Sequence, residues 1–240
     1  MAGNLPHGRR RQGAVSQPGQ LLATLEGRKA FVLANTTPLA PPHVPEIMLH
    51  LAAEAHELWL KTEDELQEIG LPPPFWAFAW AGGQGLARHV VDNSDLVAGR
   101  RVLDFATGSG LVAIAAARSG ASRVVAADID PFSLVAADLN ARLNAVDIET
   151  TSDDLVGTVE GWDVVLAGDV FYDRAFAGIL MPWFQAVARA GGTVLIGDPG
   201  RAYLPKTGLE LLATYQVPVT RELEDSEVKK TSVWRVLPAP

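Results

Sequence analysis

Two segments of the chain carry residues whose types and spacing could do chemistry. In LDFATGSG, Asp104 precedes a loop that contains Gly108 and Gly110. Glycine-rich turns between a strand and a helix bring backbone N–H groups close to a bound ligand. The second segment, WDVVLAGDVFYD, ends an apolar run with Asp169 and places Tyr172 one turn later. A carboxylate and a phenol at this spacing could bind and orient an amine, so the two segments suggest a cofactor loop and an acceptor site.

The glycine loop alone is compatible with two classes of cofactor. Residues 108–113 match the loose G-x-G-x-x-A pattern of dinucleotide-binding proteins. However, Asp104 would repel a pyrophosphate, which needs N–H donors and a helix N-terminus. S-adenosylmethionine has no phosphate; its ammonium group can pair with an acid, and its carboxylate can lie at the helix N-terminus. The loop therefore favours S-adenosylmethionine, and the alternative is a tight turn that binds no ligand.

Residues after the second and third strands are expected to complete the cofactor site. Asp128 ends the second apolar strand, where a carboxylate can accept hydrogen bonds from ribose hydroxyl groups. Ile129 would then pack against the adenine ring. Asp153 could accept a hydrogen bond from the adenine amino group, or it could be a solvated surface acid. Asp130 is expected to cap the helix that begins at Pro131.

The segment around Asp169 indicates which acceptor receives the methyl group. Enzymes that methylate planar nitrogens often carry Asn/Asp-Pro-Pro-Tyr at this point, whereas this chain has an acid, two residues other than proline, and Tyr172. Asp169 can bind a lysine ammonium group, and Tyr172 can orient the nitrogen after it loses its proton. That proton must leave because an ammonium group, with a reference pKa of about 10.4, has no free lone pair. The alternative is that Asp169 caps a helix while Tyr172 packs in the core.

Hydrophobic patterning predicts the elements that position these residues. After residue 99, short apolar strands alternate with helices, which is typical of a parallel sheet covered on both faces. The strands are expected at RRVLDF, RVVAADID, residues 147–151, WDVVLAGD and GTVLIGD, and a helix at residues 174–190. TYQVPVTREL and EVKKTSVWRVL are expected to form a terminal antiparallel hairpin. The predicted fold is α/β: a doubly wound, mostly parallel, Rossmann-like sheet of seven strands.

The part of the chain before this sheet is expected to form a helical and aromatic extension. Residues 45–69 keep an apolar rhythm of about 3.6 residues, which predicts an amphipathic helix, and a second helix is expected at roughly 83–92. Phe75 and Phe78 are expected in the core. Trp80 stands next to glycines that would let the backbone approach a ligand. The predicted parts are a disordered basic tail (1–25), an extension that caps the carboxyl ends of the strands (26–94) and the cofactor-binding domain (95–240).

Composition excludes several classes of protein. The 240 residues include no cysteine, and the five histidines show no metal-ligand spacing, so we expect no disulfide and no metal site. A net charge of -8 argues against nucleic acid as a partner. No apolar run approaches the roughly 18 residues that span a bilayer. The acid-free, arginine-containing opening could be a mitochondrial targeting segment, but the excess of arginine over lysine favours a bacterial, cytoplasmic protein over a matrix protein.

The same segments resemble a known family. PPFWAFAWAGGQGLARHVVDN, LDFATGSGLVAIAAARSGAS, DIDP, GWDVVLAGDVFYD and LIGDPGR are similar to the seven-β-strand protein-lysine methyltransferases, in particular those that modify the β subunit of electron-transfer flavoprotein. The resemblance covers roughly residues 30–237. It implies S-adenosylmethionine as the methyl donor and a protein lysine as the acceptor.

The resemblance also implies roles for individual residues. The Asp-x-x-Tyr motif of the family falls on Asp169 and Tyr172, which are the predicted catalytic residues. Ala106 stands where many methyltransferases have the first glycine of Asp-x-Gly-x-Gly-x-Gly, which bears on the geometry of the loop more than on the ligand. The residues expected at the cofactor are Trp80, Asp104, Ala106, Gly108, Gly110, Asp128, Ile129, Asp153 and Gly168.

The segment GDPGR follows the fifth strand at the same edge of the sheet. Asp198 could form a turn or face the incoming lysine, and Arg201 could pair with Asp198 or with an acid of the substrate protein. We place both residues on the substrate side.

The sequence therefore predicts an S-adenosylmethionine-dependent protein-lysine N-methyltransferase that transfers the methyl group directly, without a covalent enzyme intermediate. The predicted substrate is the electron-transfer flavoprotein β subunit, with a ribosomal protein as the alternative. The protein is expected to be a monomer or a weak oligomer. Two other classes stay open: an NAD(P)-linked oxidoreductase, and a non-catalytic protein that binds the cofactor and a partner.

Overall fold

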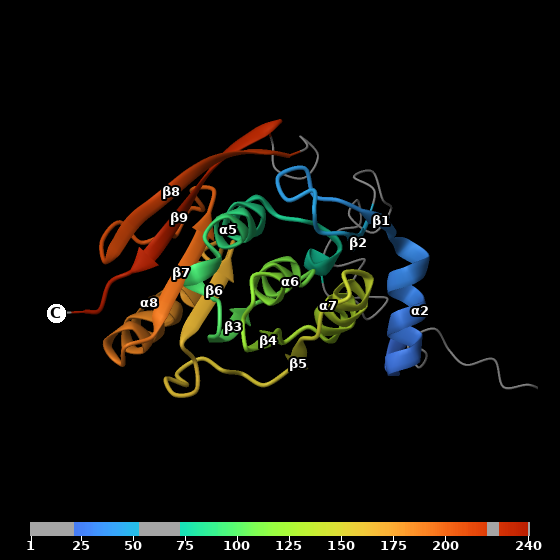
Figure 1. Ribbon diagram of the computed structural model, residues 1–240, viewed down its shortest axis with the longest axis horizontal. Helices are drawn as coiled ribbons and strands as arrows, with labels where there is room; N and C mark the ends of the chain where they lie inside the picture. Colours follow the sequence, from blue (N-terminus) through green and yellow to red (C-terminus); the bar gives the residue numbers. More distant parts are fainter. Residues whose placement is uncertain (1–21, 53–72, 220–225, 240) are drawn as a thin grey trace, which may run out of the picture.

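The computed structural model of the protein describes residues 22–52, 73–219 and 226–239. Its centre is a seven-stranded sheet in the order β5-β4-β3-β6-β7-β9-β8 (Figure 1). The strands are β3 (Arg101–Phe105), β4 (Arg123–Ala127), β5 (Glu149–Thr151), β6 (Val164–Gly168), β7 (Thr193–Asp198), β8 (Leu209–Pro218) and β9 (Val228–Val236). β3 to β7 pair in parallel, and β9 is antiparallel to both β7 and β8. The predicted mostly parallel α/β sheet and its terminal hairpin are confirmed.

Helices cover both faces of this sheet (Figure 1). One face carries α5 (Ala81–Asp92), α6 (Leu111–Arg118) and α7 (Pro131–Leu143), and the other carries α8 (Arg174–Arg189). Along β3, Val102 packs in the cluster of α5 and α6, whereas its neighbour Leu103 packs in the cluster of α8. The strands are apolar at successive positions because both faces are buried. The predicted helices at roughly 83–92 and 174–190 agree with α5 and α8 to within about two residues.

The predicted helix over residues 45–69 is wrong where it can be compared. Residues 49–51 form strand β2 (Leu49–Leu51), which pairs antiparallel with β1 (Thr37–Leu39). Leu49 and Leu51 are buried and the residue between them is half-buried, which is the alternation of a strand. Side chains of α7 hold this segment: Asn140 Oδ1 accepts from His50 N at 2.6 Å. Residues 53–69 of the prediction lie outside the described residues.

Helix α2 (Leu25–Asn35) precedes β1 and packs against α7. Thr24 caps it, because its Oγ1 accepts a hydrogen bond from Gly27 N at 3.0 Å. The Phe31 ring lies edge-on to Phe132 of α7 at 5.5 Å. The predicted tail at 1–25 falls outside the described residues up to residue 21, and its last residue begins α2.

Two short 3-10 helices, η1 (Phe75–Ala77) and η2 (Ser94–Leu96), flank α5. α5 packs on the sheet itself, because Leu86 and Val90 belong to the same hydrophobic cluster as the inner strands. The division between 26–94 and 95–240 stays a prediction. No helix in the described part of the chain is both long and apolar enough to cross a bilayer.

Candidate active site

The loop between β3 and α6 turns through three left-handed residues. Ala106, Gly108 and Gly110 have φ values of 55°, 52° and 80°. Two features require glycine at position 110. Its φ is left-handed, and an added Cβ would lie 2.9 Å from the Cα of Ala137 in α7. Ala106, which replaces the expected glycine, adopts the left-handed conformation at a cost of roughly 1–2 kcal/mol. The loop thus keeps a left-handed turn at the position where the sequence departs from the family pattern.

Asp104 lies buried beneath this loop and holds it to α6. Its side chain is 1% exposed, and its Oδ2 accepts hydrogen bonds from Thr107 Oγ1 at 2.5 Å and from Ala113 N at 3.0 Å. Burial raises the pKa of Asp104 to about 7, more than these hydrogen bonds lower it. Its predicted pairing with a ligand ammonium group stays a prediction. The sequence analysis did not predict the bond from Thr107 to Asp104. A hydroxyl residue three positions after an acid at the end of a strand could have indicated it.

Asp128 connects the end of β4 to the glycine loop. Its Oδ2 accepts from Gly108 N at 2.9 Å, and its Oδ1 accepts from Asp130 N at 3.0 Å. Both bonds orient the carboxylate, and desolvation raises its pKa. Ile129 beside it is 81% exposed, so its side chain is accessible at this edge of the sheet. Asp130 caps α7, as predicted, by accepting from Phe132 N.

Asp153 lies beyond β5, at the same edge of the sheet. It is exposed, and its Oδ2 accepts from Thr151 Oγ1 at 2.8 Å. The carbonyl oxygen of Thr151 in turn accepts from Asp128 N at 3.1 Å. The structure therefore places Asp153 next to the end of β4, and its bond to adenine stays a prediction.

Aromatic side chains form one wall beside the glycine loop. Trp80 Nε1 donates to the carbonyl oxygen of Phe75 at 2.9 Å, and the Phe75 ring lies 5.9 Å from the Trp80 ring and 6.0 Å from the Tyr172 ring. An added Cβ on Gly108 would lie 3.9 Å from the same carbonyl oxygen. Phe78 is buried as predicted, but the prediction for Phe75 is wrong: η1 turns Trp76 into the core and leaves Phe75 43% exposed.

Asp169 stands where β6, β7 and α5 meet, with a left-handed φ of 59°. Its Oδ1 accepts from Arg201 Nε at 3.0 Å and Nη2 at 2.6 Å, and its Oδ2 accepts from Gly83 N at 2.8 Å. The Asp169 side chain is only 11% exposed. The Arg201 guanidinium also lies 5.7 Å from the centre of the Trp80 ring. A strained conformation held by this many contacts is typical of a functional residue.

Glycines let α5 approach the ends of β6 and β7. A Cβ on Gly168 would lie 2.8 Å from the Cα of Gly83, and a Cβ on Gly82 would lie 2.5 Å from Asp169 Oδ2 and would overlap the carbonyl oxygen of Gly197. The glycines after Trp80 were predicted to admit a ligand. In the structure, Gly82 admits the backbone of β7 and the carboxylate of Asp169.

Asp198 and Arg201 lie at the turn after β7. Asp198 is 1% exposed, and its Oδ1 accepts from the backbone N–H groups of Gly200 at 2.6 Å and Arg201 at 2.7 Å. These contacts favour the turn-forming alternative for Asp198 over direct contact with a substrate. The Arg201 guanidinium binds Asp169, a partner that the sequence did not suggest.

The helix-capping alternative for Asp169 is also wrong. The N-cap of α8 is Asp173, whose Oδ1 accepts from Phe176 N at 2.8 Å. Tyr172 does not pack in the core, because 56% of it is exposed. Desolvation raises the pKa of Tyr172, and the negative charges of Asp128 and Asp173 raise it further. The phenol therefore stays protonated at neutral pH.

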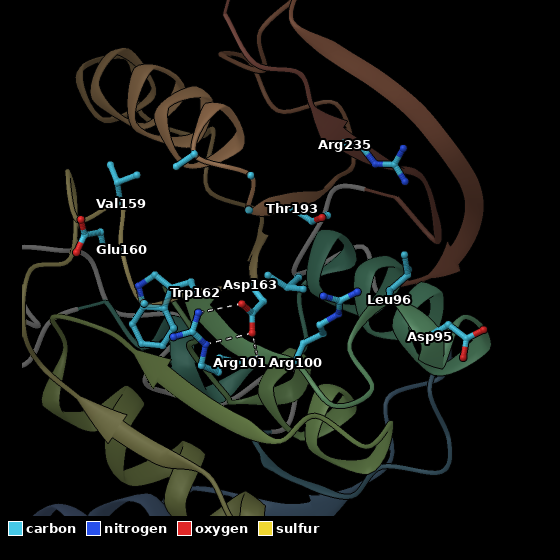
Figure 2. A pocket seen from close by; sticks show the side chains of 15 residues that line it. Asp95, Leu96, Arg100, Arg101, Val159, Glu160, Trp162, Asp163, Thr193 and Arg235 are labelled. Carbon is cyan, nitrogen blue, oxygen red and sulfur yellow. Dashed lines mark hydrogen bonds and ion pairs between the residues drawn. The ribbon is translucent and has the colours of Figure 1, made fainter.

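A cavity of about 530 Å³ lies at the opposite edge of the sheet, at the amino ends of the strands (Figure 2). Arg101, at the start of β3, lines it and binds Asp163 through Nε at 3.1 Å and Nη2 at 2.9 Å. Ligands of open α/β sheets bind beyond the carboxyl ends of the strands. The glycine loop, Asp128 and Asp169 lie at that carboxyl edge, so this cavity is a separate feature.

The chain is similar to several known proteins. A family model described as "Ribosomal protein L11 methyltransferase (PrmA)" matches residues 89–181. Proteins named electron transfer flavoprotein beta subunit lysine methyltransferase are 40% identical over 215 residues in Danio rerio and 37% identical over 235 residues in Xenopus laevis. These alignments cover 86% of this chain and 82% of the first relative, and 95% and 94% for the second. A crystal structure of ribosomal protein L11 methylase from Lactobacillus delbrueckii subsp. bulgaricus is 23% identical, covers 68% of this chain and 81% of that chain, and has a TM-score of 0.48.

The strand order, the glycine loop after β3 and the acids after β4 and β6 together define a class I methyltransferase fold. Within that class, identity of 34–40% over most of the chain assigns the family. The chain belongs to the electron transfer flavoprotein beta subunit lysine methyltransferases.

Proposed function

We propose that this protein transfers a methyl group from S-adenosylmethionine to a lysine side chain of the electron-transfer flavoprotein β subunit. Family membership supports the substrate, because the relatives that match over most of their length carry this activity in their names. One structural observation carries the chemistry: the glycine loop, Asp128, Asp169 and Tyr172 all lie at the carboxyl edge of one parallel sheet.

The residues at this edge fit S-adenosylmethionine. Left-handed turns expose backbone at Gly108 and Gly110, and Gly110 precedes the first turn of α6, which suits the carboxylate of the ligand. Asp128 can accept from ribose hydroxyl groups with the lone pairs that its two backbone bonds leave. Exposed Ile129 can pack on adenine, and Trp80 and Asp153 flank the same edge. When bound, the cofactor supplies a methyl group on a cationic sulfur.

On this proposal the protein acts mainly by positioning. The Asp169 carboxylate and the Tyr172 hydroxyl hold the lysine Nζ, and the aromatic wall of Phe75 and Trp80 excludes water from its side chain. The lysine loses a proton to water, its lone pair forms the new N–C bond as the S–C bond breaks, and a second proton leaves the product amine. No residue forms a covalent bond to the methyl group.

A ribosomal protein is the second candidate substrate, because residues 89–181 match the L11 methyltransferase model.

We propose that the protein acts in the bacterial cytoplasm, with the mitochondrial matrix as the alternative. We further propose a monomer or weak oligomer, with no nucleic acid, membrane or metal involved.

A direct comparison of substrates tests this function. Purified protein is incubated with isotopically labelled S-adenosylmethionine and either electron-transfer flavoprotein or ribosomal protein L11. The proposal expects label on a lysine of the flavoprotein β subunit. Label on L11 alone would keep the lysine chemistry and reject the substrate, whereas cofactor binding without label on any protein of a whole-cell extract would favour a non-catalytic protein.

A further inference from the structure

The ion pair between Arg201 and Asp169 occupies the carboxylate that was expected to bind the lysine ammonium group. Both guanidinium nitrogens that reach it bind Oδ1, and Gly83 N at the start of α5 binds Oδ2. The side chains of Asp169 and Arg201 are 11% and 23% exposed, so water screens the pair poorly. A guanidinium and a helix N-terminus thus already compensate the charge of Asp169.

This compensation affects the protonation state of the substrate. An uncompensated carboxylate within about 4–6 Å favours the charged form of an amine and raises its pKa by about 1–3 units. A lysine held in that way would keep its proton and lack the lone pair needed for methyl transfer. A carboxylate neutralised by Arg201 can still accept a hydrogen bond from a neutral amine, without stabilising the ammonium form.

We propose that Arg201 is a positioning residue that neutralises Asp169, so that the site binds the neutral lysine amine in preference to the ammonium ion. This inference rests on the proposed function, because it concerns how that acceptor site selects a reactive substrate. Arg201 acts through Asp169 and is itself fixed from two sides, by the Asp198 turn that holds its backbone N–H and by the face of Trp80.

Other charged groups near the pair are few in the part of the chain that the structure describes. β7 contributes Asp198, whose Oδ1 is bound by the turn. Asp173, the N-cap of α8, and Asp128, which follows β4, lie close enough to Tyr172 for their charges to raise its pKa. The first turn of α5 contains no acid. Removal of Arg201 would therefore take away the guanidinium charge that binds Asp169 Oδ1, while the bond from Gly83 N to Oδ2 stays.

The test measures kcat against pH for the wild type and for Arg201→Gln and Arg201→Lys, with the substrate protein at saturation. Arg201→Gln is expected to shift the acidic, rising limb of the kcat profile to higher pH by about one unit, which corresponds to about a tenfold loss at neutral pH that shrinks as the pH rises. KM should stay level or fall. Arg201→Lys keeps the positive charge. Its kcat should therefore depend on pH as in the wild type, with a lower maximum value of kcat. Arg101→Gln is the control, because it breaks another two-nitrogen contact between an arginine and an aspartate, with Asp163 at the opposite edge of the sheet.

A binding measurement makes the inference independent of turnover. n-Butylamine, a probe for the lysine side chain, is titrated at neutral pH by ligand-observed NMR in the presence of S-adenosylhomocysteine. Arg201→Gln should bind the ammonium form about tenfold more tightly than the wild type. Equal or weaker binding by the variant, or an equal loss of kcat at every pH, would overturn the inference. Absence of methyl transfer by the wild type, together with the expected butylamine result, would reject the proposed function alone.

Discussion

The buried acid beneath the glycine loop makes a prediction about stability that needs no ligand. Asp104 has a pKa of about 7 in the folded protein and 3.8 when unperturbed, because burial disfavours its charged form. The folded state therefore retains a proton that the unfolded state has already released above pH 4. Its contribution to stability is complete below pH 4 and is lost as the pH rises toward and past 7.

The size of this loss follows from the shift. A difference of about 3 pKa units corresponds to about 4 kcal/mol, a large share of the roughly 5–15 kcal/mol that stabilises most proteins. Asp104→Asn removes the ionisation but keeps an oxygen that can accept from Thr107 and Ala113. The free energy of unfolding of Asp104→Asn should thus rise by about 4 kcal/mol relative to the wild type between pH 4 and pH 8.

Urea unfolding at a series of pH values, followed by circular dichroism, measures this difference. Asp130, whose pKa burial raises to about 6, adds to the pH dependence of both proteins and cancels in the comparison. Asp163→Asn is the control of opposite sign: Arg101 lowers the pKa of Asp163 to about 2, so its loss of stability occurs only as the pH falls below about 4. A difference between Asp104→Asn and the wild type that stays constant from pH 4 to pH 8 would refute the assignment of a buried, protonated Asp104.

Three further predictions concern the site. Asp169→Ala should lower kcat at least about 100-fold, because the lysine loses its hydrogen-bond acceptor and meets the guanidinium of Arg201 without its carboxylate. Calorimetry should find the cofactor affinity of this variant within a few fold of the wild type. An equal loss of cofactor affinity would remove Asp169 from the acceptor site. Asp128→Ala should weaken cofactor binding about tenfold or more, and unchanged affinity would remove it from the ribose site. Gly82→Ala should destabilise the fold by about 1–3 kcal/mol in urea, since its Cβ would overlap Gly197 and Asp169, whereas Gly83→Ala, with nothing within 4 Å, should be neutral or stabilising. Equal unfolding midpoints for these two alanine variants would contradict the close packing of α5.

The sequence predicted the sheet well because its signals are local. The run VVLAG in β6 is apolar at every position, which is typical of a strand buried on both faces. Asp130 and Pro131 mark the start of α7. The prediction failed at residues 49–51, where an apolar rhythm typical of a helix was interpreted without knowledge of Asn140 and Asn144, which bind the backbone N–H groups of His50 and Met48.

Within the site, residue types could be predicted but their pairings could not. The glycine loop and the Asp-x-x-Tyr motif are short patterns, and the structure brings them to one edge of the sheet as expected. The partner of Arg201 depends on the turn after β7 and on the approach of α5 to β6, which are long-range contacts. The sequence suggested Asp198 or an acid of the substrate protein as the partner of Arg201, whereas the guanidinium in the structure binds Asp169, 32 residues away.

We propose that residues at the carboxyl edge of this sheet methylate a protein lysine. The most direct measurement is mass spectrometric mapping of electron-transfer flavoprotein after incubation with S-adenosylmethionine and either the wild type or Asp169→Ala, with Arg101→Gln as a control for folding. In an incubation just long enough for the wild type to methylate the β subunit fully, we expect full methylation with Arg101→Gln and at most about one hundredth of it with Asp169→Ala. Methylation by Asp169→Ala at a rate near that of the wild type, or an unmodified β subunit with all three proteins, would contradict the assigned reaction.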